Sequence, residues 1–235
     1  MPIKEKKLKP EEIKIIYEDN HIIIVEKPVN IPIQEDESGD IDMLTLLKEN
    51  IKKRYNKPGN VFLGLVHRLD RPAGGVMIFA KTSKAASRLS EQVRTRNIKK
   101  TYFAVIHGKP EKASRTLKDY LLKDNKTNTV SIVNKDLNGA KEAILDYTLI
   151  ETKGGLSLVK VNLQTGRPHQ IRVQFAGIGH PLFGDQRYGS QVNKPGQQIA
   201  LWSHEIGFEH PVSKEALVFR SVPEKIYPWN EFKLA

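Results

Sequence analysis

Short apolar segments separated by polar turns dominate this sequence, and few helical segments lie between them. Segments with strand character lie at 13–17, 22–28, 61–66, 75–80, 101–107, 129–133, 142–150, 156–162, 199–203 and 216–220. Strands that follow one another without an intervening helix pair through turns, whereas successive parallel strands need long crossover connections. This order therefore predicts an α+β fold built on a mixed, largely antiparallel sheet with flanking helices.

Two segments have the spacing of amphipathic helices and begin at residues that can cap them. The first predicted helix spans 42–54, with Asp40 or Asp42 as its N-cap. Its apolar positions are Ile41, Leu44, Leu47 and Ile51. The second is predicted to start at a Ser83 cap. It is expected to bury Ala86, Leu89 and Val93 and to expose Arg88, Arg94 and Arg96.

The 235 residues contain no repeat, low-complexity tract or linker, and one domain of this length can bury a substantial core. We expect a polar, basic lead-in over 1–12 and a single catalytic domain over 13–235. No apolar run approaches the roughly 18–20 residues of a membrane span, and the N-terminus lacks the apolar core of a secretory signal. A cytoplasmic monomer is the default expectation.

A strong excess of positive charge narrows the class of partner. The chain has 38 Lys and Arg residues against 27 Asp and Glu, a formal net charge of +11. A basic surface concentrates polyanions, which favours a nucleic-acid partner over the alternative that the lysines only keep the protein in solution. The charge does not distinguish DNA from RNA, nor does it say whether the partner is chemically changed.

The segment 65–80 combines a polar loop with two flanking apolar strands. The loop contains one histidine, one aspartate and two arginines: His67, Asp70, Arg68 and Arg71. A carboxylate held at the end of a strand is a candidate reactive group, although an aspartate in an ordinary Asx-turn has the same local sequence. Gly74 and Gly75 let the backbone turn sharply or approach a ligand closely.

Two further segments place polar residues at the ends of apolar elements. Lys100 leads into a strand that carries Tyr102, which by itself is typical of a core residue. Thr165 is expected to cap a short helix with Pro168 in its first turn. Arg172 lies one turn farther on between apolar neighbours, where an arginine often turns inward to pair with a carboxylate.

The sequence lacks the motifs of several other chemistries. His67, His169 and His180 have no metal-binding spacing, and there are no cysteines, so no metal site is expected. The glycine-rich loops of nucleotide-binding proteins and the GxSxG turn of serine hydrolases are absent as well. A carboxylate remains as the candidate reactive group, with no nucleotide cofactor expected.

The segment His67-Arg68-Leu69-Asp70, followed by glycines and an apolar strand, resembles the hallmark motif of the RluA-like RNA pseudouridine synthases. Other segments are similar to the family in the same order. They are 17–28 for the opening hairpin, 100–102 for the tyrosine strand, 165–172 for the arginine motif and 179–189 for the closing loop. The resemblance extends over about 13–220, essentially the whole chain.

The resemblance implies a pseudouridine synthase fold with a central active-site cleft. It also implies an enzyme that isomerises specific uridines in structured ribosomal or transfer RNA to pseudouridine, without a cofactor or a metal. By the same resemblance Asp70 is the nucleophile, Arg172 pairs with it and Tyr102 lines the pocket near the uracil. Arg68 is implied to fill the space that the flipped base leaves. The expected RNA-binding and base-flipping residues are Arg68, His67, Arg71, Arg167, His169 and Lys100.

These roles agree with the chemistry of the residues. A reaction that breaks a glycosidic bond and rejoins the base through carbon needs a carboxylate to attack or stabilise the cationic sugar centre. An arginine partner favours the ionised form of Asp70 and fixes its direction. A base within structured RNA is reached only by flipping, which costs about a few kcal/mol that stacking and phosphate contacts offset.

The sequence departs from the family in three places. Pro72-Ala73-Gly74 stands where the family usually has Thr-Ser-Gly, which removes two hydroxyl groups near Asp70. Gln174 stands where a histidine is usual, two residues after Arg172. Many relatives also have an N-terminal S4 RNA-binding domain. None is expected before the opening hairpin here, so the catalytic domain itself is expected to hold the RNA.

Two other functions fit part of the pattern. A catalytically inactive RNA-binding or RNA-folding factor on the same scaffold would explain the lost hydroxyl groups, but it would not need Asp70, Tyr102 and Arg172 together. A glycoside hydrolase would need two facing carboxyl groups, and only Asp70 lies in a motif. RNA isomerisation is therefore the leading hypothesis.

Overall fold

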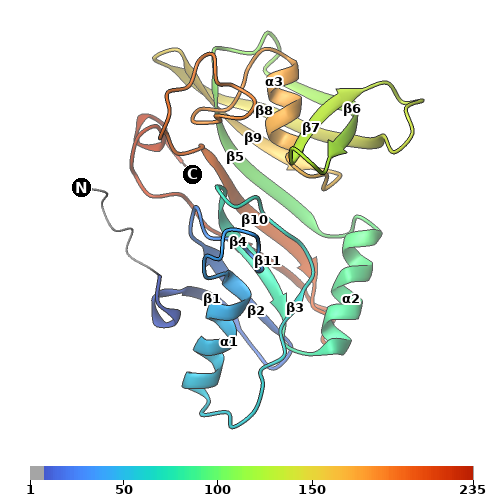
Figure 1. Cartoon of the computed structure of the whole chain (residues 1–235), viewed down its shortest axis with the longest axis vertical. Helices are drawn as coiled ribbons and strands as arrows, with labels where there is room; N and C mark the ends of the chain where they lie inside the picture. Colours follow the sequence, from blue (N-terminus) through green and yellow to red (C-terminus); the bar gives the residue numbers. More distant parts are fainter. Residues whose placement is uncertain (1–7, 235) are drawn as a thin grey trace.

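The computed structural model describes residues 8–234, which form one large twisted sheet with three α-helices (Figure 1). The helices are α1 (Met43–Arg54), α2 (Ser83–Arg94) and α3 (Gln170–Gly177), with short 3-10 turns η1 (Pro10–Glu12) and η2 (Trp229–Glu231). The strands are β1 (Lys14–Glu18), β2 (Ile22–Lys27), β3 (Gly64–Leu65), β4 (Gly74–Ala80), β5 (Lys99–His107), β6 (Ser114–Asp124), β7 (Thr129–Val133), β8 (Lys141–Lys153), β9 (Leu156–Leu163), β10 (Leu201–Glu209) and β11 (Ala216–Arg220).

The sheet has the order β1-β2-β4-β10-β5-β9-β8-β6-β7, with β3 joined to β4 and β11 joined to β10. Among the strand pairings of the described residues, that of β10 with β4 is parallel and the others are antiparallel. The predicted α+β class with a mixed, largely antiparallel sheet is confirmed.

Alternation along β2 explains how the helices cover both faces of this part of the sheet. Ile23 and Val25 pack in the cluster that contains the buried side of α1. Ile22 and Ile24 point the other way and pack in the cluster that contains the buried side of α2. Successive strand residues face opposite sides, so a fully apolar strand is buried from both.

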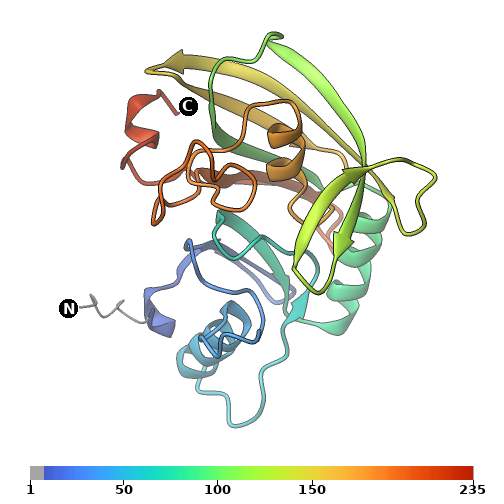
Figure 2. The same cartoon turned by 45° about the horizontal axis from the view of Figure 1, so that its top comes forward.

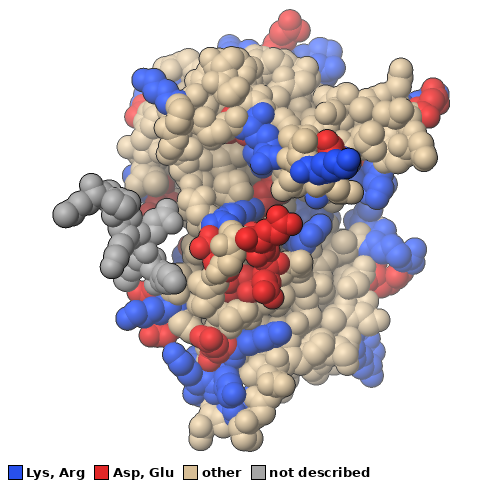
Figure 3. Space-filling view, in the orientation of Figure 1, with Lys and Arg blue, Asp and Glu red and all other residues tan. Residues whose placement is uncertain are grey.

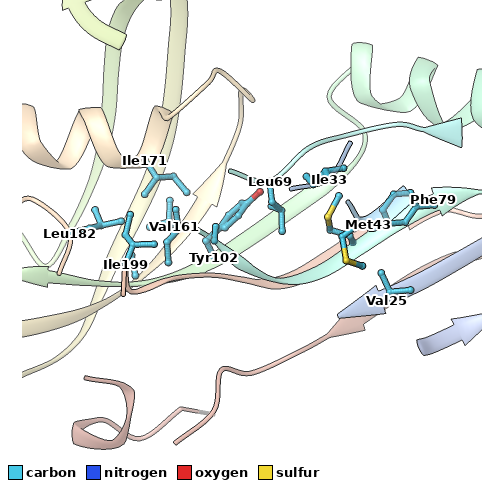
Figure 4. Packing of buried hydrophobic residues seen from close by; sticks show 14 of the residues in the cluster. Val25, Ile33, Met43, Leu69, Phe79, Tyr102, Val161, Ile171, Leu182 and Ile199 are labelled. Atoms are coloured by element: carbon cyan, nitrogen blue, oxygen red, sulfur yellow. The ribbon is translucent and has the colours of Figure 1, made fainter. Parts of the chain in front are cut away.

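The cluster that contains the buried side of α1 continues along the sheet to α3. It joins Val25, Met43 and Phe79 at one end to Ile171 and Leu182 at the other, with Tyr102 between them (Figure 4). The two helices lie at opposite ends of the molecule (Figures 1 and 2).

Two glycines allow β4 to approach β10. A Cβ on Gly75 would lie 2.2 Å from the carbonyl oxygen of Ser203, and its φ of +117° is one that other residues rarely adopt. A Cβ on Gly74 would lie 2.3 Å from the ring of Trp202. These glycines therefore serve a close approach between strands, whereas the sequence suggested a sharp turn or an approach to a ligand.

Some predicted boundaries were wrong. The apolar segment 61–66 contributes only the two-residue strand β3. The strand predicted at 199–203 continues as β10 to Glu209, and the strand predicted at 142–150 is the longer β8. Of the predicted lead-in over 1–12, residues 1–7 lie outside the described part, whereas Pro10–Glu12 forms a 3-10 turn.

The two longer helices were placed correctly, but some of their details were not. Asp42 caps α1 by accepting a hydrogen bond from the backbone of Thr45, as one of the two predicted caps. Thr82, and not Ser83, caps α2. The fully buried residues of α2 are Ala85 and Leu89, whereas Ala86, Val93 and Arg88 are half-buried.

The strand β6 was missed because its inward positions do not look like a core. Leu117 and Leu121 are buried there, but the inward position between them is Asp119. That carboxylate accepts a hydrogen bond of 2.7 Å from Nε2 of Gln174 on α3. A polar pair thus interrupts the apolar alternation by which strands are recognised.

Among residues 8–234, no helix combines the length and the apolar content that a membrane crossing requires.

Replacement of Gly75 by alanine is expected to lower the free energy of unfolding by at least about 2 kcal/mol, because the new methyl group meets backbone and the φ angle is unfavourable. Urea denaturation measures the change. Gly59→Ala is the control, since nothing lies within 4 Å of its added Cβ, and a change within about 1 kcal/mol is expected there. Equal stability of the two variants would contradict this account of the β4–β10 contact.

Candidate active site

A cleft of about 1010 Å³ opens between the loop before β4, the start of β5 and the loop before α3. Every residue predicted for the site lines this cleft: Asp70, Tyr102, Arg172, Arg68, His67, Arg71, Arg167, His169 and Lys100. These residues come from segments far apart in the sequence, and the sheet brings them together. Acidic side chains gather over the loop between β2 and α1, with Lys and Arg side chains around them (Figure 3).

Arg172, in the first turn of α3, holds two carboxylates at the floor of the cleft. Its Nε and Nη2 donate to the two oxygens of Asp185 at 2.8 and 2.9 Å. Its Nη1 donates to Asp70 at 3.2 Å. Burial alone lowers the pKa of this guanidinium, but the hydrogen bonds and charges of Asp185 and Asp70 outweigh it, so the net pKa is raised and Arg172 is always charged.

Asp185 is the inner partner, and its side chain is 0% exposed. The backbone N–H groups of Arg187 and Tyr188 also donate to it. Burial alone raises the pKa of Asp185, but Arg172 and these N–H groups outweigh it, so the pKa lies below its ordinary value. Sequence reasoning missed this residue, although it lies in the closing-loop motif, because a motif does not show which carboxylate turns inward.

Asp70 is the outer partner, and its side chain is 24% exposed toward the cleft. Its backbone carbonyl accepts a hydrogen bond from the N–H of Ala73, so the chain does turn here. Within the described residues, the carboxylate is bonded to Arg172 and not to a neighbouring backbone N–H. The Asx-turn alternative is therefore wrong, and the carboxylate is free to face a ligand.

Lys27 fixes the backbone of the loop that carries Asp70. Its buried ammonium donates to the carbonyl oxygens of Pro28, Arg71 and Ala73, at 2.8, 3.0 and 2.7 Å. Burial lowers the pKa of Lys27 to about 7, and the negative charge of Asp70 opposes that shift. The sequence analysis did not single out this lysine. The clue was a charged residue at the end of an apolar strand, directly before a proline.

These carbonyl contacts also show how the loop holds its shape without the hydroxyl groups of the usual family motif. Lys27 binds the carbonyl of Ala73, and the side-chain amide of Gln198 donates to the carbonyl of Pro72 at 2.7 Å. The turn is therefore fixed through its backbone, for which the side chains at positions 72 and 73 are not needed.

Tyr102 is buried on β5, on the face of the sheet that forms the cleft. Its ring lies next to Leu69 (Figure 4). Burial raises the pKa of its phenol, and the negative charge of Asp70 raises it further. The hydroxyl group therefore keeps its proton and presents a rigid, neutral surface beside Asp70.

His67 and Arg71, which were predicted to bind RNA, make contacts within the protein. Nε2 of His67 accepts a hydrogen bond from the backbone N–H of Ile78 at 3.2 Å. Burial, with the positive charge of Lys100, lowers the pKa of His67 to about 3, so the ring is neutral. Arg71 pairs with the carboxylates of Asp36 and Asp40. Their contact with RNA stays a prediction.

The other predicted basic residues range from exposed to half-buried. Arg68 is exposed, and Lys100 is half-buried, with a pKa that burial lowers. Nε of Arg167 donates to the carbonyl of Glu142 at 2.8 Å. Nδ1 of His169 lies 2.7 Å from the hydroxyl of Tyr188.

The start of α3 differs from the prediction. Thr165 does not cap the helix, because its hydroxyl accepts from the N–H of Ile144 and donates to the side chain of Gln170. The cap position is His169, in the left-handed conformation with φ of +51°, and Pro168 lies before the helix. This tight entry brings Arg172 within reach of both carboxylates.

Within residues 8–234, no group of three or more His, Asp or Glu side chains is arranged to hold a metal ion.

The geometry is matched by similarity to known proteins. A family model described as RNA pseudouridylate synthase matches residues 21–177. The chain belongs to this family. It is therefore an RNA pseudouridine synthase, an isomerase.

Curated relatives of the chain carry the same description. The uncharacterized RNA pseudouridine synthase YhcT of Bacillus subtilis is 34% identical over 88% of this chain and 67% of its own length. An uncharacterized RNA pseudouridine synthase of Aquifex aeolicus is 35% identical over 95% of this chain and 75% of its own. The ribosomal large subunit pseudouridine synthase C of Haemophilus influenzae is 32% identical over 89% and 65%.

Solved structures share the fold of this synthase. Human RNA Pseudouridylate Synthase Domain Containing 4 superposes with a TM-score of 0.76 over 90% of this chain and 89% of that chain, at 20% identity. Human RNA Pseudouridylate Synthase Domain Containing 1 gives a TM-score of 0.75 over 95% and 88%, at 22% identity. The pseudouridine synthase fold is thus confirmed.

Asp185→Asn is expected to lower the free energy of unfolding by about 3–5 kcal/mol, because it leaves the buried charge of Arg172 without its bidentate carboxylate partner. Asp70→Asn removes only the longer, partly exposed contact and is expected to lose about 1 kcal/mol or less. Urea denaturation of both variants measures the difference. Equal losses would contradict the assignment of Asp185 as the structural partner.

The same comparison has a pH dependence. Because the folded-state pKa of Asp185 is lowered, its stabilisation is present above about pH 4, the ordinary aspartate value, and is lost as the pH falls through the folded-state pKa. The stability difference between the wild type and Asp185→Asn should therefore narrow in acid. A constant difference would contradict the lowered pKa.

Proposed function

We propose that this synthase isomerises selected uridines of ribosomal or transfer RNA with Asp70 as the nucleophile. The observation that supports this most is a partly exposed carboxylate, held by a buried arginine at the floor of a basic cleft. A carboxylate that only stabilised the fold would not need to be open to a ligand. Tyr102 lies beside it and Lys27 fixes its loop.

The chemistry fits these positions. Isomerisation breaks the bond between the sugar and a base nitrogen and forms a bond from the same sugar carbon to a base carbon. That base carbon gives up its proton, and the freed nitrogen takes one up, so the atoms balance without a cofactor. The Asp70 carboxylate attacks or stabilises the electron-poor sugar carbon while the base turns. Arg172 fixes the direction of the carboxylate, and the buried ring of Tyr102 bounds the space in which the uracil moves.

The cleft has groups that suit a flipped nucleotide. Flipping costs about a few kcal/mol, which new contacts must offset. Arg68 is exposed at the cleft and takes the place of the departed base, as the family resemblance implies. Arg167, His169 and Lys100 line the cleft where they reach the flanking phosphates.

We further propose that large-subunit ribosomal RNA is the first substrate to test. The relatives of Haemophilus influenzae and Buchnera aphidicola are named ribosomal large subunit pseudouridine synthase C, at 31–33% identity. Transfer RNA is the second.

The catalytic unit is the single domain over 13–235, in keeping with one continuous sheet, and it acts as a monomer.

Asp70→Asn is expected to abolish pseudouridine formation while RNA affinity stays within about threefold, because the amide keeps the shape but not the nucleophilic charge. Transcripts of large-subunit ribosomal RNA and of transfer RNA are incubated with each protein, and pseudouridine is measured by nucleoside chromatography. Asp136→Asn, on an exposed residue, is the matched control and should be fully active. A fully active Asp70→Asn variant would contradict the assignment of Asp70 as the nucleophile.

A further inference from the structure

A second groove of about 490 Å³ adjoins the active-site cleft. Its lining comes from the start of β5, the end of β9 and the neighbouring part of β10. Thr101, Lys160 and Asn162 lie on the face of the sheet opposite Tyr102, because Asn162 pairs with Thr101 and Lys160 pairs with Phe103 across the two strands. The groove therefore opens on the back of the strands that form the cleft.

The groove and the cleft are continuous around the start of β5. Five side chains line both: Arg96, Ile98, Lys100, Leu163 and Gln164. A chain that lies in the cleft can therefore pass over this rim into the groove without leaving the protein surface.

The groove contains basic side chains that form no ion pair within residues 8–234. Within residues 8–234, no side-chain hydrogen bond or ion pair is formed by three of these basic residues, Lys99, Lys160 and Arg96. Lys99 and Arg96 are exposed. The acidic lining residue, Glu205, is already paired with Arg220 at 2.6 Å. Elsewhere on the surface many cations have a carboxylate partner, as Lys14 has Glu26.

Polar side chains between these cations are suited to a sugar-phosphate chain. The hydroxyl of Thr101 donates to Oδ1 of Asn162 at 3.1 Å, which orients the exposed amide N–H₂ group of Asn162 outward. Amide donors next to lysines bind phosphate and ribose oxygens and do not select a base.

We propose that this groove binds the ribose-phosphate backbone of the RNA strand that flanks the target nucleotide, after the strand has crossed the rim at Lys100. The proposal rests on the proposed function for the direction of the strand. It adds a second binding site to that function, whose main contacts are Lys99 and Lys160. An RNA strand fits better than an acidic protein segment because the groove is continuous with the cleft that holds the RNA substrate.

The test compares the binding of a short and a long RNA. The probes are fluorescein-labelled oligouridines of about 5 nucleotides, which fill the cleft alone, and about 16 nucleotides, which reach the groove. The variant is Lys99→Glu/Lys160→Glu. The control is Lys52→Glu/Lys225→Glu, which makes the same change in net charge at exposed lysines outside both sites. Fluorescence anisotropy at several KCl concentrations gives affinities and salt slopes.

The groove variant is expected to lose at least about tenfold in affinity for the long probe, with its salt slope reduced by about 1.4, or 0.7 for each lost contact to a single strand. Its affinity for the short probe should equal that of the control. Equal losses on the two probes, or a loss on the long probe no larger than in the control, would overturn the proposal. Binding of polyglutamate that depends on the same lysines, without a loss on the long RNA, would overturn it in favour of an acidic protein segment.

Lys99→Gln/Lys160→Gln guards against misfolding of the reversed-charge variant. This variant should also lose affinity for the long probe and not for the short one, by about half as much on a logarithmic scale. The midpoint of its thermal unfolding should equal that of the wild type. Pseudouridine formation is measured separately. A wild type that forms no pseudouridine but whose stronger binding of the long probe needs Lys99 and Lys160 would refute the proposed function and support the groove. A wild type that forms pseudouridine but binds the long probe without need of these lysines would support the proposed function and overturn the groove proposal.

Discussion

One buried guanidinium determines the geometry of the candidate active site. Arg172 is fixed on α3, which packs against β6 and β7, and it reaches Asp185 on one side and Asp70 on the other. A buried cation without partners would be destabilising by several kcal/mol, and the two carboxylates without it would repel each other. The buried charge of Arg172 therefore depends mainly on Asp185, and of its two carboxylate partners Asp70 is the one that faces the cleft.

The walls of the cleft differ in charge. The exposed loop with Glu35 and Asp36 forms one side of the cleft, in the region where acidic side chains gather (Figure 3). Arg71 pairs with Asp36 of this loop, so it is not a free cation. Basic residues line the remainder of the cleft: Arg68, Arg94, Arg96, Lys100, Lys123 and Arg167. A phosphate chain is repelled by the first wall and attracted to the others. The second groove opens from the basic side, at Arg96 and Lys100.

The sequence predicted most of the strands with regular apolar alternation and both long helices, and every residue that it named for the site lines the cleft. It failed where a polar contact replaces apolar packing, as at Asp119 and Gln174 in the missed strand β6. Lys27 and Asp185 were missed for a related reason. Their importance comes from burial and from partners distant in sequence, such as the carbonyl of Ala73 for Lys27. Local patterns do not contain such contacts.

In the proposed function Arg172 directs Asp70 toward the RNA and does not itself provide RNA affinity. Single-turnover isomerisation of an RNA that the wild type modifies, measured together with RNA affinity in Arg172→Lys, tests this most directly. Lysine keeps the charge beside Asp185 but cannot bind both carboxylates in the same geometry. The rate constant should fall by about 100-fold while affinity changes by less than about threefold. A loss confined to affinity, with an unchanged rate constant, would contradict the account.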